Sequence, residues 1–281
     1  MKDLKNEIRS NVRQALSEDL GAGDLTASLI PAEKELTAYV VSREDSVLCG
    51  TQWFEACFQT LSSNTQVHWF ANDGETVRSG QKLCEITGNA CVLLSAERSA
   101  LNFLQLLSAV ATQTRRHVDA IAGTNAVIVD TRKTLPGLRL AQKYAVTCGG
   151  GVNHRIGLYD GILIKENHII AAGGIQSALT RAQAIAPAGV FIQIEVESLQ
   201  ELQEALSAHA TMILLDNFTL DQLQEAVTLT RQQTGQPVVL EASGNITLDN
   251  VRQVAETGVD RISVGSLTKN VQAIDLSMRF V

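Results

Sequence analysis

The sequence lacks an excess of positive charge. Acidic side chains outnumber basic ones by 30 to 23, which leaves a formal net charge of −7 over 281 residues. Proteins that bind nucleic acids or anionic membrane surfaces through their overall field need the opposite sign. The charge therefore argues against both partners, and a polyanionic ligand would have to be bound by a local cluster of cations.

Long apolar runs and paired cysteines are also missing. The opening residues, MKDLKNEIRSNVRQALSEDL, carry charges throughout and do not resemble a signal peptide. No apolar run approaches the roughly 20 residues that span a membrane. The five cysteines contain no CxxC pair, which argues against a disulfide or zinc framework. We therefore expect a soluble, cytoplasmic protein with buried thiols.

What is present is typical of a globular protein. Hydrophobic residues make up 45% and charged residues 19% of the chain. Apolar spacing predicts helices over 4–16 and 51–61, and a long amphipathic helix over 94–122. Strand-like alternation covers 36–48, and β-hairpins are expected over 67–90. The first part of the chain is therefore expected to mix helices with antiparallel strands.

The hairpin region admits a second interpretation. The spacing of DG, V, SG and L in the segment NDGETVRSGQKL resembles half of a biotinyl or lipoyl carrier motif. The lysine that carries the cofactor in those domains is missing, so we interpret the hairpins as structural. A non-catalytic carrier or binding module remains the alternative from a different functional class.

The second part of the chain has a different pattern of apolar residues. Short apolar strands alternate with helical segments, which predicts parallel βαβ units. The predicted strands are AVIVDTRKT, GILIKENH, VFIQIEVES, MILLDNF, PVVLEASG and RISVGSL. They end on polar residues, as strands do at the active-site rim of an α/β barrel. Because only about six strands are visible, fewer than the eight of a closed barrel, we expect an incomplete one.

Basic side chains gather at the ends of the first two of these strands. DTRKT places Arg132 and Lys133 at one strand end, where they could bind an anion or lie in a solvated loop. CGGGVNHRIGLYDGILIKENHI adds four more basic groups, at His154, Arg155, Lys165 and His168. The density of this second block favours an anion-binding site.

Acidic side chains end the next strands. Glu195, Asp216 and Glu241 could cap helices or pair with the basic cluster. Alternatively, they could hold Mg²⁺ or stabilise a cationic transition state. The turns that follow the last two strands, Ser243–Asn245 and Val264–Ser266, offer small residues whose backbone N–H groups could bind phosphate.

Together these blocks resemble the quinolinate phosphoribosyltransferase family. The resemblance is carried by EDLGAGDLT, ERSALNFLQ, DTRKTLPGLR, the long QKYAVTCGGGVNHRIGLYDGILIKENHI block, IEVES, LLDNF, LEASGNI and ISVGSLT, in the family's order. It implies an N-terminal α/β sandwich over 1–115, to which 270–281 returns. It also implies an incomplete, open α/β barrel of the type II phosphoribosyltransferases over 116–269.

The resemblance further implies a reaction. Quinolinate and phosphoribosyl pyrophosphate would give nicotinate mononucleotide, pyrophosphate and CO₂, with Mg²⁺ as cofactor. The implied catalytic residues are Lys133, Glu195 and Asp216, the last two near the ribose and the metal. The implied substrate-binding residues are Arg98, Thr131, Arg132, Lys133, His154, Arg155, Lys165, His168, Glu195, Asp216, Glu241, Ser243, Gly244, Asn245, Val264, Gly265 and Ser266.

Within that set the resemblance assigns distinct roles. Arg132, His154 and Arg155 resemble the quinolinate carboxylate clamp, whereas Lys133, Lys165 and His168 resemble phosphate and pyrophosphate contacts. Arg98 resembles the arginine that one subunit contributes to its neighbour, which implies a homodimer. The alternatives within the same chemistry are a nicotinate-specific sister enzyme and a paralogue tied to molybdenum transport. Retention of Arg98 with the carboxylate clamp speaks against the former.

Overall fold

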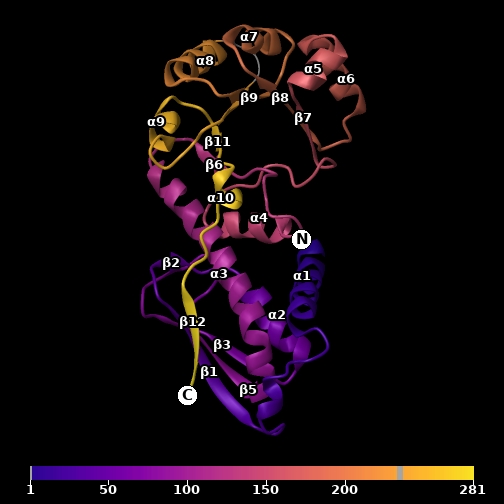
Figure 1. Ribbon diagram of the computed structural model, residues 1–281. Helices are drawn as coiled ribbons and strands as arrows, with labels where there is room; N and C mark the ends of the chain where they lie inside the picture. Colours follow the sequence, from indigo (N-terminus) through magenta and orange to yellow (C-terminus); the bar gives the residue numbers. More distant parts are fainter. Residues whose placement is uncertain (1, 233–236) are drawn as a thin grey trace. The chain divides into compact units, whose positions relative to one another are not determined.

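The computed structural model describes residues 2–232 and 237–281, which form two compact units (Figure 1). The first unit runs to Arg115 and also includes Thr134–Gly150 and Leu267–Val281. The second unit consists of Arg116–Lys133 and Gly151–Ser266. This division differs from the expected boundary, because 134–150 and 267–269 belong to the first unit although sequence reasoning placed them in the barrel.

The first unit is built on a four-stranded antiparallel sheet with the order β12-β1-β5-β3. These strands are β12 (Leu276–Phe280), β1 (Glu35–Ser42), β5 (Lys82–Asn89) and β3 (Gln66–Trp69). A smaller antiparallel pair joins β2 (Ser46–Val47) to β4 (Thr76–Val77). The C-terminal segment thus forms an outer strand beside β1.

Helices of the first unit supply its core. They are α1 (Lys2–Leu20), the 3₁₀ helix η1 (Ala27–Leu29), α2 (Thr51–Leu61), α3 (Ala90–Ala120) and α4 (Arg139–Cys148). Trp53, Phe54 and Phe58 of α2 are fully buried, together with the apolar face of α3. The last residues of α3 enter the second unit. Within the described ranges, no helix has the length and apolarity to cross a membrane.

The second unit contains a six-stranded parallel sheet with the order β6-β11-β10-β9-β8-β7. Its strands are β6 (Val127–Val129), β7 (Gly161–Ile164), β8 (Phe191–Val196), β9 (Met212–Asp216), β10 (Val239–Ser243) and β11 (Arg261–Ser263). The associated helices are α5 (Glu166–Ala172), α6 (Ile175–Ile185), α7 (Leu199–Ser207), α8 (Leu220–Gln232), α9 (Val251–Glu256) and α10 (Ser266–Lys269). Each strand falls in one of the six expected segments, and the predicted open α/β barrel is confirmed.

The barrel is open between β6 and β7. Every other pair of successive strands is adjacent, but the chain from 134 to 150 leaves this sheet for the first unit. Among the described residues, β6 and β7 therefore remain the two edges of the sheet. Parallel pairing aligns the strand ends, so that Ser243 lies opposite Asp216. Polar residues at these ends consequently share one edge of the sheet.

Gly149 provides a test of packing in the first unit. A Cβ at this position would lie 2.5 Å from the backbone oxygen of Ala111 and 2.5 Å from Cβ of Thr114, both on α3. Because a helix backbone cannot move aside, Gly149→Ala should lower the free energy of unfolding by about 1–3 kcal/mol. Thermal and denaturant unfolding would measure the change.

Gly161→Ala is the matched control. Its Cβ would also meet an atom at 2.5 Å, but that atom belongs to the ring of Phe191, a side chain that can rotate. The control should lose less stability than Gly149→Ala, and Phe191→Leu should restore what it loses. Equal losses in the two glycine variants would contradict the proposed difference between backbone and side-chain obstruction.

Candidate active site

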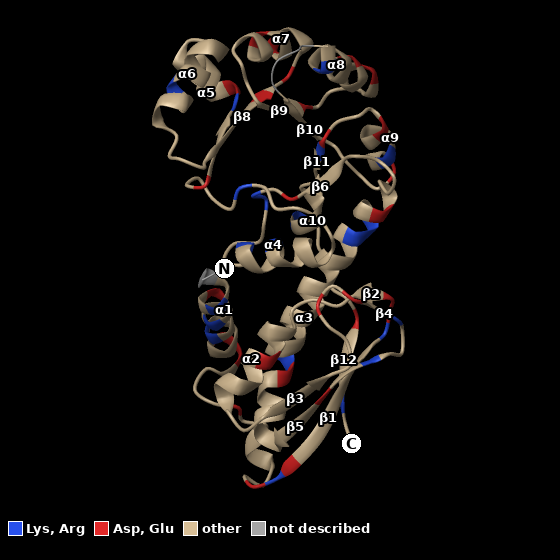
Figure 2. Ribbon diagram, turned by 180° about the vertical axis from the view of Figure 1, so that it is seen from behind, with Lys and Arg blue, Asp and Glu red and all other residues tan. Residues whose placement is uncertain are grey.

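A cavity of about 160 Å³ lies at the carboxyl edge of the parallel sheet in the second unit. Nine of the residues expected from the sequence line it: Thr131, Arg132, Lys133, His154, Arg155, Lys165, Glu195, Glu241 and Ser243. They come from the ends of β6, β7, β8 and β10 and from the segment before β7. Figure 2 shows acidic segments beside β8 and β9 in the same unit. The fold therefore gathers cations and carboxylates around one concave space.

Two guanidinium groups stand close enough to affect each other. Arg155 is 8% exposed, and its Nη1 donates to the backbone oxygen of Gly161 at 3.0 Å. Burial, and then the positive charge of Arg132, lower the pKa of Arg155. Two like charges in a partly desolvated space are stabilised by an anion that contacts both. The pair is thus suited to a ligand with more than one negative charge.

His154 has partners at both ring nitrogens. The backbone N–H of Arg155 donates to Nδ1 at 2.7 Å, so Nδ1 carries no hydrogen. Nε2 lies 2.7 Å from Oε1 of Gln193 and therefore donates to it as the protonated nitrogen. The backbone N–H of His154 also donates to Oδ1 of the buried Asp130 at 2.8 Å. These bonds select the Nε2–H tautomer and fix the ring beside Arg155.

The hydrogen-bond chain continues beneath the cavity. Nε2 of Gln193 donates to Oε2 of Glu241 at 3.3 Å, and Nε of Arg261 lies 3.2 Å from the same oxygen. The Glu241 side chain is fully buried, and its charge is balanced by Arg261. The 3.8 Å approach of its other oxygen to Nε2 of His154 is not an ion pair, because the imidazole is neutral in this tautomer. Glu241 therefore lines the cavity while its Oε2 is held by Gln193 and Arg261.

Carboxylates form a second cluster at the ends of β8 and β9. Oxygens of Glu195, Glu197 and Asp216 lie within 4.8 Å of one another. Burial, and then the negative charge of Glu195, raise the pKa of Asp216. Lys165 forms an ion pair with Glu195 at the side facing the cavity. Clustered hard oxygen donors of this kind suit a divalent cation such as Mg²⁺.

The glycine-containing turns adjoin these groups. A Cβ on Gly265 would lie 3.3 Å from Cδ of Lys133 and 3.7 Å from Oγ1 of Thr131. The missing side chain thus leaves room for the lysine stem to lie against the turn after β11. Val264 is held in place because its N–H donates to the backbone oxygen of Val129 at 2.9 Å, and Ser266 begins α10.

The turn after β10 lines an adjoining cavity of about 240 Å³. Gly244 has φ +97° there, and a Cβ would lie 2.2 Å from Oδ1 of Asn217. Asn245 has φ 51°, and its amide donates to the same oxygen at 3.2 Å. Ser243 lines both cavities, which places this turn next to the cationic space.

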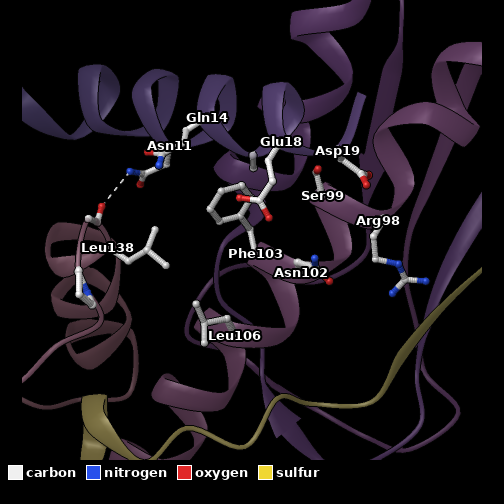
Figure 3. A pocket seen from close by; sticks show the side chains of 13 residues that line it. Asn11, Gln14, Glu18, Asp19, Arg98, Ser99, Asn102, Phe103, Leu106 and Leu138 are labelled. Carbon is white, nitrogen blue, oxygen red and sulfur yellow. Dashed lines mark hydrogen bonds between the residues drawn. The ribbon is translucent and has the colours of Figure 1, made fainter. Parts of the chain in front are cut away.

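Two further expected residues neither line the cationic cavity nor belong to the acidic cluster or to the glycine-containing turns. His168 is exposed at the start of α5, where its Nδ1 accepts the backbone N–H of Lys165 at 3.0 Å. Arg98 is exposed on α3 in the first unit, where it lines a different cavity of about 330 Å³ with Glu18 and Asp19 (Figure 3). Neither position assigns the residue a substrate contact within this chain.

Sequence reasoning missed several groups around the cavity. Asp130 and Ser263 line it, Gln193 and Arg261 orient its buried polar groups, and Glu197 joins the acidic cluster. Gln193 carried a usable signal: it is a polar residue in an apolar strand, on the same face as Glu195 two positions later. Arg261 carried none, because an arginine that begins a strand is usually solvated.

The tautomer of His154 can be tested directly. Long-range ¹H–¹⁵N NMR near pH 7 should show a protonated Nε2 and an unprotonated Nδ1, because of the bond from the Arg155 N–H. His154→Asn would assign the signal by its loss. Gln193→Leu should remove the acceptor for Nε2–H and weaken this preference. A doubly protonated ring, or a proton on Nδ1 alone, would contradict the hydrogen-bond chain.

Comparisons with known proteins agree along the length of the chain. The family model "Quinolinate phosphoribosyl transferase, N-terminal domain" matches residues 24–108, and the corresponding C-terminal domain model matches residues 110–279. The chain is 41% identical to a probable nicotinate-nucleotide pyrophosphorylase [carboxylating] of Bacillus subtilis, covering 97% of this chain and 93% of the relative. It is 42% identical to the Mycobacterium leprae enzyme of that name, with 96% of each covered.

Solved structures agree with the sequence matches. The nicotinate-nucleotide pyrophosphorylase of Francisella tularensis superimposes with a TM-score of 0.94 at 43% identity, covering 98% of this chain and 96% of that one. Human nicotinic acid phosphoribosyltransferase, with a TM-score of 0.62 at 15% identity, shares the fold alone. On the strength of both family models and these relatives, the chain belongs to the quinolinate phosphoribosyltransferase family.

Proposed function

We propose that the cationic cavity transfers the phosphoribosyl group of phosphoribosyl pyrophosphate to quinolinate. The products are nicotinate mononucleotide, pyrophosphate and CO₂, a step of de novo NAD biosynthesis. Family membership supports the reaction, and the observation that carries the site is the juxtaposition of Arg132 and Arg155 in one small cavity. A cytoplasmic location stays a prediction from the sequence.

Quinolinate is a dianion, and the two guanidinium groups match its charge. Each can bind a carboxylate through a planar pair of N–H donors. His154 has both ring nitrogens occupied, so its contribution is to hold the backbone of Arg155 in place. The direct carboxylate contact that the resemblance implies for His154 would require its bond to Gln193 to be exchanged for one to the ligand, and it stays a prediction. Positioning the pyridine nitrogen for in-line attack is the main catalytic effect of such a clamp.

Phosphoribosyl pyrophosphate requires further cations and backbone donors. Lys133 and Lys165 line the cavity as point charges suited to pyrophosphate oxygens. The turns Ser243–Asn245 and Val264–Ser266 supply the backbone groups for the 5′-phosphate. Because Nδ1 of His168 accepts the backbone N–H of Lys165, Nε2 is the nitrogen that contacts phosphate in this proposal.

The acidic cluster acts on the ribose. Cleavage of the bond to pyrophosphate develops positive charge at the anomeric carbon, and Glu195 and Asp216 stabilise that charge. At about 4 Å and an effective dielectric of about 20, one such interaction amounts to about 4 kcal/mol. The carboxylates must be ionised for this role. Because the pKa of Asp216 is raised, its stabilising charge is lost on acidification at a higher pH than for an ordinary aspartate.

Mg²⁺ fits the same carboxylates. Glu195 and Asp216, joined by Glu197, present the oxygen donors that this ion prefers. When bound, Mg²⁺ would neutralise part of the pyrophosphate charge. Decarboxylation then needs no general base from the protein, because a pyridine nitrogen that has become quaternary withdraws electrons from the bond to the 2-carboxylate.

An assay of the purified protein tests this function. Quinolinate, phosphoribosyl pyrophosphate and Mg²⁺ should yield nicotinate mononucleotide and CO₂, and chelation of the metal should abolish the yield. Arg155→Ala should weaken kcat/KM for quinolinate on the order of a hundredfold or more, since it removes a charged pair to a carboxylate. Arg181→Ala, an exposed arginine of α6, is the matched control.

Two outcomes would overturn the proposal. Absence of product with all three components present would reject the reaction. Turnover of nicotinate in place of quinolinate would favour the monocarboxylate-specific sister enzyme, for which a second carboxylate partner is unnecessary.

Arg98 acts in the site of a second subunit in our proposal, as the family resemblance implies. We propose a homodimer in which Arg98 completes the site of its partner. Arg98→Ala and Arg155→Ala should each lose most of the activity when expressed alone. Coexpression should restore about one quarter of the wild-type activity, because half of the dimers are mixed and each has one intact site. No recovery in dimers shown to be mixed would mean that Arg98 acts within its own chain.

A further inference from the structure

Outside the candidate active site, the first unit contains a cluster of two thiols and a carboxylate. Sγ of Cys49, Sγ of Cys148 and an oxygen of Asp73 lie within 4.8 Å of one another. Cys49 lies two residues before the start of α2, separated from it by Gly50, and Cys148 is the last residue of α4. The two cysteines are 99 positions apart in the sequence, so only the fold brings their sulfurs together.

The backbone around both thiols is held by hydrogen bonds. The N–H of Cys49 donates to Oγ of Ser108 at 3.0 Å. Arg115 donates from Nε to the oxygen of Gly149 at 2.9 Å and from Nη2 to the oxygen of Cys148 at 3.4 Å. These bonds fix the two chain segments, so that a bond between the sulfurs would require mainly side-chain rotation.

Asp73 and Tyr144 order the space beside the thiols. Oη of Tyr144 donates to Oδ2 of Asp73 at 2.8 Å, and the N–H of Thr51 donates to Oδ1 at 3.2 Å. The carboxylate is therefore already held by two donors. This arrangement leaves the sulfurs as the reactive groups of the cluster.

The two thiols differ in exposure and acidity. Cys49 is fully buried, and burial raises its pKa well above the usual value. Cys148 is partly exposed, and a hydrogen bond from the Cys49 thiol lowers its pKa. An accessible thiol that ionises more readily reacts first with an oxidant, and a protected neighbour can then resolve the product.

We propose that Cys148 and Cys49 form an oxidation site for hydroperoxides that ends in an intramolecular disulfide. The Cys148 thiolate attacks the peroxide, the O–O bond breaks, and a sulfenic acid forms as the alcohol or water leaves with a proton. The Cys49 sulfur then attacks the sulfenic sulfur, its proton leaves with the hydroxyl group as water, and the S–S bond forms. Overall, the two thiols lose two electrons, and the peroxide gains the same two electrons.

The remaining cysteines provide internal references. Cys57 and Cys84 are buried, and burial raises the pKa of both, that of Cys57 to about 12. Cys91 is partly exposed, and its sulfur contacts the backbone oxygen of Ala27 at 3.5 Å. Burial protects Cys57 and Cys84 from a dissolved oxidant, and Cys91 is not part of the cluster of Cys49, Asp73 and Cys148. Disulfide formation should therefore select Cys49 and Cys148.

The test uses the full-length reduced protein and hydrogen peroxide. After blocking with an alkylating reagent and non-reducing digestion, mass spectrometry should find one cross-linked peptide pair, Cys49 with Cys148, which dithiothreitol releases. In Cys49→Ser, a dimedone adduct should accumulate on Cys148 on the order of tenfold above that on Cys57 or Cys84. Cys91→Ser is the matched control and should form the cross-link at the wild-type rate.

Three outcomes would overturn the proposal. One is a cross-link that involves a cysteine other than Cys49 and Cys148, or the absence of any cross-link at peroxide concentrations that convert Cys148 to a sulfenic acid. Another is equal dimedone labelling of Cys148 and the buried cysteines in Cys49→Ser, with unfolding curves showing that the variant is folded. The third is stoichiometric zinc in the purified protein that protects both thiols, which would make the cluster a metal site.

Discussion

Parallel strand pairing is the constraint on which the candidate site depends. A parallel ladder brings the carboxyl ends of all its strands to one edge, whatever their separation in the sequence. Lys165 after β7, Glu195 near the end of β8 and Asp216 at the end of β9 thereby become neighbours. The gap between β6 and β7 arises because the intervening chain belongs to the first unit.

The charges of the second unit form two layers with different functions. In the first layer, Glu241 lines the cavity, is balanced by Arg261 and is linked through Gln193 to His154. Glu241, Gln193 and His154 are buried, and their hydrogen bonds stabilise one arrangement of side chains, while Oε1 of Glu241 accepts no hydrogen bond from the described residues. In the second layer, arginines, lysines and carboxylates line the cavity. An acidic protein can thereby concentrate cations where polyanionic substrates bind without acquiring a basic surface.

Much of the site was predictable because its residues cluster in short motifs at strand ends. Short motifs predicted Arg132, Arg155 and Lys165, namely DTRKT, NHR and IKENH, and the pattern of strands predicted the open barrel. The residues that hold Glu241 and His154 were harder to predict from the sequence. Gln193 gave a weak periodic signal, and Arg261 gave none. The domain boundary also differed, because 134–150 has ordinary helical periodicity that does not specify which core it joins.

The amino-acid sequence by itself determined the family, the order of strands and helices, and the chemical character of the site. Those properties depend on local patterns and on motifs that are contiguous along the chain. Only the tertiary structure decided the tautomer of His154, the burial of Glu241 against Arg261 and the meeting of Cys49 with Cys148. Each of these depends on distances between residues remote in sequence, and no local pattern encodes such distances.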